Sequence, residues 1–169
     1  MDFKDAVYSR TSVRKFDSKE ISEDILNEIV HYGLKAPSAK NYRPWEIYVI
    51  TNKDVMQEFR NRIPSGNYNC NAMILVCGNK NRFIEGEGEG FWIQDASAAI
   101  ENIILASTSF GIGSVWIGVY PIKAKIDSAK EILSLPENII PLGLIDLGYP
   151  MGEVTPKNIN DDDKIHFIK

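Results

Sequence analysis

The sequence has 169 residues, a formal net charge of −4 and a charged fraction of 25%. This length fits a single domain over residues 1–169, enough to bury about 70% of the surface of the unfolded chain. A mildly acidic chain lacks the positive field that attracts nucleic acid or anionic membranes, so neither is an expected partner. The N-terminus has no apolar run, and the most apolar stretch, 91–110, carries Asp95 and Glu101. We therefore expect a cytoplasmic protein without a signal peptide or a membrane span.

Hydrophobic periodicity and capping residues predict the elements of the first half of the chain. Ser22 is placed to cap a helix whose apolar positions recur every three to four residues, and Pro37 forbids its continuation. Asn52 caps a short amphipathic helix in the same way. Between and after them lie runs rich in β-branched and apolar residues, which favour strands. We expect helices over 2–9, 22–33 and 52–63, and strands over 46–51 and 72–77.

The second half continues the alternation less regularly. The polar stretch 79–90 ends in Gly-Glu-Gly-Glu-Gly, whose glutamates would repel an anion, so we expect a flexible connection or a lid. A helix over 92–110 is apolar nearly all round and requires cover on most sides, for which a second copy of the chain is a natural candidate. Pro141 indicates an edge strand or a bulge. The remaining expected elements are strands over 114–120 and 139–149, a helix over 122–133, and an apolar end at 165–168 that could add a strand to this sheet or to a partner's.

Helices and strands alternate irregularly and no strand is followed by Gly-x-Gly-x-x-Gly, so we expect a central mixed or antiparallel sheet and not a Rossmann array. The two cysteines, Cys70 and Cys77, are seven residues apart, which on a strand directs their side chains to opposite faces. We expect both to be buried, reduced and structural, with no metal site. We also expect His31, on a predicted helix, and His166, in the tail, to be structural and not catalytic.

The segment Arg10-Thr11-Ser12-Val13-Arg14 directly follows the first predicted helix. By strand alternation, Arg10, Ser12 and Arg14 lie on one side. Guanidinium groups bind phosphate in bidentate fashion, and hydroxyls suit phosphate or ribityl oxygens. Taken alone, however, the segment is better explained as a solvated basic turn.

Two further segments combine stiffness with hydrogen-bonding groups. The stretch from Ala36 to Trp45 (Ala-Pro-Ser-Ala-Lys-Asn-Tyr-Arg-Pro-Trp) holds two prolines and several polar side chains. A helix stop followed by a strand start explains Pro37, but not Asn41 or the Pro-Trp pair. In Gly-Ile-Gly-Ser-Val-Trp-Ile-Gly-Val-Tyr (111–120), Gly118 weakens a strand unless something planar approaches its backbone closely.

Together, these three segments resemble the nitroreductase family of flavoproteins. The resemblance lies in Arg-x-Ser-x-Arg near the N-terminus, Pro-Ser-Ala-x-Asn-x-x-Pro-Trp after it, and Gly-x-Gly-Ser-x-Trp-Ile-Gly after a buried helix. Residues 95–106 and Leu-Gly-Tyr-Pro at 147–150 are also similar to the family, so the resemblance covers almost the whole chain. It implies an α+β fold with the central sheet flanked by helices, and a homodimer with one FMN at each end of the subunit interface, contacted by both chains.

The resemblance also implies which residues bind the cofactor. Arg10 and Ser12 would hold the phosphate and ribityl chain, Arg14 would lie at the pyrimidine edge, and the Gly118 N–H would meet flavin N5. Residues 37–41 would reach the flavin from the partner subunit. The full implied set is Arg10, Thr11, Ser12, Arg14, Pro37, Ser38, Ala39, Asn41, Ile117, Gly118, Val119 and Lys157.

The chain departs from the family pattern in two places. Family members often end with a pair of cations closing on the phosphate, whereas here Lys157 is followed by Ile159. The link from Arg62 to Cys70 is also brief, so Asn67 or Asn69 could replace a flavin contact. We expect Arg10 to carry more of the phosphate than is usual in the family.

The resemblance implies an FMN-dependent oxidoreductase in which NADH or NADPH gives hydride to flavin N5 and a nitroaromatic, quinone or similar small acceptor then replaces it, in a ping-pong cycle. No nucleophilic side chain is required, because the flavin carries the chemistry. The alternatives are a flavin-binding or storage protein without useful turnover, and another flavin reaction on the same fold, such as fragmentation or reductive dehalogenation. No motif for a ribose 2′-phosphate is visible, so both reductants remain candidates.

Overall fold

A four-stranded antiparallel sheet in the order β1-β2-β4-β3 forms the centre of the molecule. The computed structural model describes all residues, 1–169. The antiparallel form of the predicted sheet is confirmed, and the strands lie within a few residues of the expected positions. They are β1 (Trp45–Ile50), β2 (Ala72–Asn79), β3 (Gly113–Gly118) and β4 (Ile139–Gly148).

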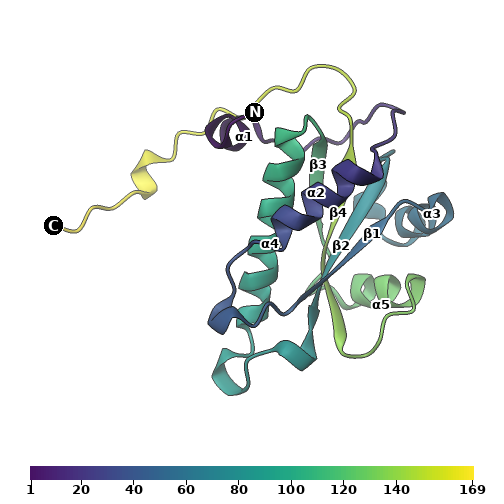
Figure 1. Cartoon of the computed structure of the whole chain (residues 1–169), viewed down its shortest axis with the longest axis vertical. Coiled ribbons are helices and arrows are strands. Elements are labelled where there is room, and N and C mark those ends of the chain that lie inside the picture. Colours follow the sequence, from purple (N-terminus) through teal and green to yellow (C-terminus); the bar gives the residue numbers. More distant parts are fainter.

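Five helices cover the two faces of this sheet (Figure 1). One apolar layer joins the sheet to α2 and α4, and α1 packs against α4. The other layer joins the sheet to α3 and α5. The helices are α1 (Phe3–Ser9), α2 (Glu23–Gly33), α3 (Lys53–Arg62), α4 (Phe91–Ser109) and α5 (Lys123–Ile132). None of them is both long and apolar enough to cross a membrane.

The predicted caps are formed. The Ser22 hydroxyl accepts from the Ile25 N–H, and the Asn52 carboxamide accepts from the N–H groups of Asp54 and Val55. Each side chain satisfies amide donors that the first helical turn leaves without a partner. The sequence therefore places the starts of α2 and α3 correctly.

Helix α4 is covered mainly by its own chain. The sheet, α1 and α2 pack on it, and α2 approaches so closely that a Cβ on Gly33 would lie 2.6 Å from Ile103 Cγ1. The stretch 79–90, expected to be a flexible connection or a lid, contains two short turns, η3 (Lys80–Arg82) and η4 (Gly86–Gly88). Phe83 anchors it by stacking on Trp92, with ring centroids 5.1 Å apart.

Two local predictions need correction. Pro141 lies in β4, which is a central strand and not an edge. The bulge alternative is right, because the register shifts beside it, between Val76 and Cys77 of β2. Both cysteines are free and buried as expected, but Cys70 precedes β2 and packs in the same apolar cluster as Cys77, not on the opposite face. Burial raises the pKa of Cys70 to about 12, so the thiol stays protonated and inert.

A buried carboxyl group interrupts the layer under α3. Asp146 of β4 is fully buried, and neither of its carboxyl oxygens receives a hydrogen bond. Burial raises its pKa to about 7, although the Arg60 guanidinium on α3 acts in the opposite direction. Arg60 itself is held by two carbonyl groups, those of Tyr68 and Cys70. The carboxyl group is therefore a source of instability once it is ionised.

We expect this group to make the protein less stable as pH rises. The unfolded carboxyl ionises near 3.8, whereas the folded one keeps its proton up to about 7. The folded state thus binds more protons between these values, and the free energy of unfolding falls as pH increases across that window. The cost above pH 7 is at most roughly 4 kcal/mol. In urea titrations, Asp146→Asn should raise the free energy of unfolding by most of this amount at pH 8 and by almost nothing at pH 4. An equal gain in stability at both pH values would refute the assignment.

Candidate functional site

The segment Arg10–Arg14 runs beside the first residues of β3. The Val13 N–H donates to the Ser114 carbonyl at 2.9 Å, and Ser12 forms a parallel bridge with Ser114. Gly113 allows this approach, since a Cβ there would lie 2.8 Å from Val13 Cβ. The N-terminal segment is therefore attached to the outer edge of the sheet.

The charged groups of this segment are free to meet an anion. Arg10 ends α1, where its N–H donates to the Ala6 carbonyl, and its side chain forms no ion pair. The Arg14 guanidinium makes one long hydrogen bond, 3.4 Å to the Ser12 carbonyl, and no ion pair. Thr11 and Ser12 are half-buried beside them. The basic-turn alternative does not account for this attachment to the sheet.

The other end of β3 presents bare backbone. Ile117 and Val119 are buried in the layer beneath α3 and α5, whereas Gly118 is exposed, and no atom lies within 4 Å of where its Cβ would be. Ser114 directs its carbonyl outward to Val13, so by alternation the N–H and C=O of Gly118 also face outward. The Lys125 ammonium donates a hydrogen bond to the Gly118 carbonyl at 2.9 Å. The Gly118 N–H is thus available to a ligand lying on the open side.

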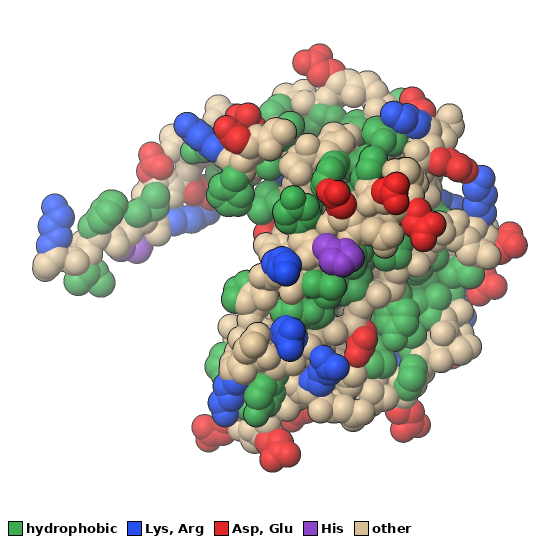
Figure 2. All heavy atoms as spheres, viewed as in Figure 1, with side chains coloured by type: hydrophobic (Ala, Val, Ile, Leu, Met, Phe, Trp, Pro, Cys, Tyr) green, Lys and Arg blue, Asp and Glu red, His purple; other side chains and the backbone are tan.

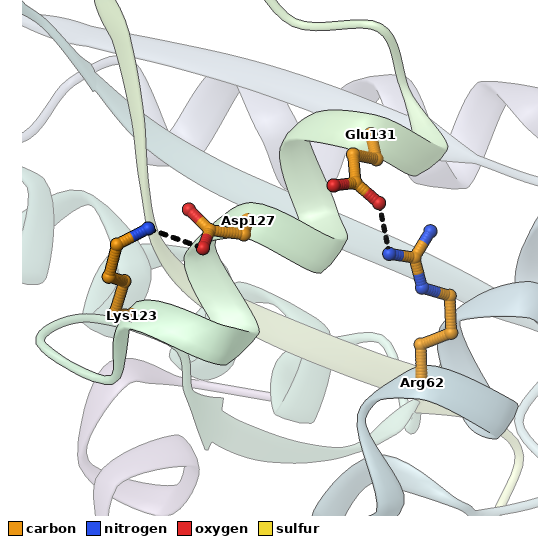
Figure 3. Close-up of polar contacts among 4 residues, drawn as sticks. All are labelled: Arg62, Lys123, Asp127 and Glu131. Carbon is orange, nitrogen blue, oxygen red and sulfur yellow. Dashed lines mark hydrogen bonds and ion pairs between the residues drawn. The ribbon is translucent and has the colours of Figure 1, made fainter.

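A set of contacts between α3 and α5 holds this end of β3 in place. Arg62 pairs with Glu131 across the two helices, and Lys123 pairs with Asp127 within α5 (Figure 3). Lys125 joins the same region by donating to Ser65 Oγ at 2.8 Å, in the turn η2 (Pro64–Gly66). Sequence analysis missed Lys125, because nothing in its spacing distinguishes it from the other lysines of an amphipathic helix.

The loop from Pro37 to Arg43 has a defined conformation, which includes the short turn η1 (Ala39–Asn41). The Ala39 N–H donates to Asp95 Oδ1 of α4 at 2.9 Å, and Ser38 Oγ accepts from the Arg43 N–H at 2.9 Å. Asp95 was also missed as a positioning residue, although its burial in an apolar helix was a usable signal.

The structure does not bring this loop to the Arg10–Arg14 segment within one chain. The loop precedes β1, and β1 and β3 are the opposite edges of the sheet, three strand spacings or about 14 Å apart. The candidate residues therefore fall into two groups, one on each edge. Lys157 belongs to neither group: the start of the tail stays beside the N-terminal segment, where the Met151 N–H donates to the Lys15 carbonyl, and residues 155–169 are exposed and lead away from the sheet (Figure 1).

The Asn69 side chain holds the backbone of Phe16, two residues beyond the Arg10–Arg14 segment. Its amide donates to the Phe16 carbonyl at 2.9 Å, and its oxygen accepts from the Phe16 N–H at 3.4 Å. Phe16 is fully buried at the end of the Arg10–Arg14 segment. Asn69 thus fixes the course of that segment, while Asn67 is exposed.

The residues on the β3 edge fit a flavin mononucleotide. Two unpaired guanidinium groups suit a phosphate and an electron-rich ring edge, and a glycine with open space and an outward N–H suits a planar ring.

Comparison with known proteins shows similarity over most of the chain. The model of the nitroreductase family matches residues 7–69 and 64–149. A protein from Methanothermobacter thermautotrophicus, named as a candidate NADH dehydrogenase/NAD(P)H nitroreductase, is 34% identical over 172 residues, covering 100% of this chain and 88% of its own.

Solved structures show the same similarity in three dimensions. A candidate NADH dehydrogenase/NAD(P)H nitroreductase from Parabacteroides distasonis has a TM-score of 0.91 and 32% identity, over 98% of this chain and 96% of that one. An FMN-dependent nitroreductase from Clostridium difficile has a TM-score of 0.86 and 27% identity, over 97% and 98% of the two chains.

The two glycines of β3 provide a matched pair of substitutions. We expect Gly113→Ala to lower the free energy of unfolding by about 1–3 kcal/mol, because the new methyl group collides with Val13. Gly118→Ala should leave stability unchanged or slightly higher, because its methyl group meets open space. Urea titrations of the cofactor-free proteins measure both. Equal losses in the two variants would contradict the packing described here.

Proposed function

The chain belongs to the nitroreductase family, and from this we propose that it is an FMN-dependent oxidoreductase that uses NADH or NADPH to reduce small acceptors such as nitroaromatics or quinones. We propose in the same way that residues 1–169 act as one flavin-binding domain. The observation that carries the proposal is the outer edge of β3, with unpaired cations at one end and the bare Gly118 backbone at the other.

Bound FMN supplies two-electron redox chemistry that no side chain of this site offers. Arg10 and Ser12 bind its phosphate and ribityl oxygens, and Thr11 lines the same segment. The Arg14 guanidinium stabilises negative charge at the pyrimidine edge. The Gly118 N–H donates to N5 and orients that atom, while the buried side chains of Ile117 and Val119 hold the strand in position.

We propose that the other group of residues acts from a second copy of the chain. Pro37, Ser38, Ala39 and Asn41 precede β1, so the width of the sheet separates them from the β3 edge of their own chain. The tail supports a dimer as well, since it exposes Ile165, Phe167 and Ile168 by 60%, 84% and 98%. Apolar side chains at this exposure are typical of a segment that packs on a partner. In this dimer, the tail would bring Lys157 close to the flavin phosphate.

The absorption spectrum of the purified protein tests this function. We expect bound FMN, bleaching on anaerobic addition of NADH or NADPH, and recovery when a quinone is added. Steady turnover with the quinone separates an enzyme from a storage protein, in which flavin would be bound but unreactive. Protein that neither contains FMN nor binds it when supplied would eliminate the proposal.

Arg10→Ala should lose FMN, because Lys157 has no second cation beside it to hold the phosphate. The measurement is flavin per chain after gel filtration. Lys4→Ala, on the exposed surface of the same helix, is the matched control and should retain normal content. Near-normal flavin in the Arg10 variant would show that the phosphate is held elsewhere.

A further inference from the structure

An open groove of about 700 Å³ lies beside the Pro37–Arg43 loop. One wall is formed by Lys40, Asn41 and Tyr42, and the other by the segment 81–85 that follows β2. All of its lining residues belong to one chain. We name it the 40/82 groove, after the cation on each wall.

Asn79, at the end of β2, forms hydrogen bonds with the segments that lead into both walls of the 40/82 groove. Its N–H donates to the Pro44 carbonyl at 2.6 Å and its side-chain amide to Glu46 Oε1 at 2.8 Å. Its side-chain oxygen accepts from the Asn81 N–H at 3.1 Å and from Asn138 at 3.0 Å. One residue therefore ties both walls together and holds them at a set separation.

The loop wall is held in an unfavourable backbone conformation. Lys40, Asn41 and Arg43 have φ angles of 51°, 57° and 47°, and they are three of the four non-glycine residues with positive φ in the chain. Such conformations cost free energy and cluster at ligand-binding loops. The hydrogen bonds that the Arg43 N–H donates to Ser38 Oγ and the Ala39 N–H donates to Asp95 maintain the loop in this form.

The groove carries positive charge in a protein that is acidic overall. Lys40 and Arg82 line it, Arg43 adjoins it, and none of these three forms an ion pair. Glu85 is the one acidic residue of the lining. Figure 2 shows Lys and Arg side chains gathered over the region that Figure 1 gives to η1 and the turns before α4, with acidic side chains along the lower margin.

The remaining lining residues suit a nucleotide. The Tyr42 ring is 47% exposed and offers a face for stacking of a base. Asn41 and Asn81 provide amides that can donate to and accept from a base or a ribose. A planar guanidinium and an ammonium on facing walls match a diphosphate.

We propose that the 40/82 groove binds the adenosine diphosphate half of the nicotinamide dinucleotide reductant. The inference rests on the proposed function, in which the 37–41 loop lies against the flavin of a second copy. A reductant whose nicotinamide reaches that flavin then extends its charged half along the neighbouring groove. Lys40 and Arg82 hold the diphosphate, and Tyr42 stacks on the adenine.

The test compares two reductants on the FMN-loaded enzyme. Arg82→Gln and Tyr42→Ala should each raise the KM for the dinucleotide about fivefold, and the double variant more than tenfold, with kcat unchanged. N-benzyl dihydronicotinamide, which lacks the adenosine diphosphate, should keep its KM in all variants. ADP-ribose should bind the wild-type protein in calorimetry and bind the double variant at least tenfold more weakly. Lys80→Gln, on η3 but outside the lining, is the control and should behave as wild type.

Two results would overturn the groove assignment and leave the proposed function intact. One is an unchanged dinucleotide KM in the double variant; the other is an equal rise in KM for Lys80→Gln, which would indicate a general effect of surface charge. In both cases N-benzyl dihydronicotinamide would still reduce the flavin. If neither reductant reduces bound FMN, the proposed function fails and the groove proposal fails with it.

Discussion

The outer edge of β3 is the constraint on which the rest of the site depends. An edge strand has a row of backbone groups without partners, which proteins normally cover. Here Val13 covers the first part of the row, and the Lys125 ammonium takes the Gly118 carbonyl at the other end. The outward Gly118 N–H is left to a ligand. Asn69, Asp95 and the α3–α5 contacts act at a distance from the chemistry, by fixing the segments that border this edge or the opposite one.

Much of the fold could be predicted from the sequence because its signals are local. β-Branched runs marked the strands, and Ser22 and Asn52 marked helix starts. The order of the strands could not be predicted, since it depends on long-range pairing. For that reason Pro141 was compatible with an edge as well as with the bulge where it lies. Cys70 was placed on the wrong face because alternation applies only inside a strand, and the chain reaches β2 two residues later.

The site was predictable in its parts but not in its arrangement. The motifs identified Arg10, Gly118 and the 37–41 loop, yet only the sheet order shows that they occupy opposite edges. Asp146 and Lys125 carried no signal at all, because a buried acid and a bridging lysine are defined by their neighbours. The positive charge of the 40/82 groove likewise comes from residues more than forty positions apart.

In the proposed dimer, each flavin site combines the β3 edge of one chain with the 37–41 loop of the other. Mixing two defective chains tests this arrangement. One chain carries Arg10→Ala, and the other has residues 37–41 replaced by glycine; each alone is expected to fold and to lack FMN. The two chains are denatured together in equal amounts and then refolded. We expect about a quarter of the sites to regain FMN, because half of random dimers are mixed and each mixed dimer has one intact site. Recovery of no flavin, with mixed dimers demonstrably present, would contradict a site shared between two chains.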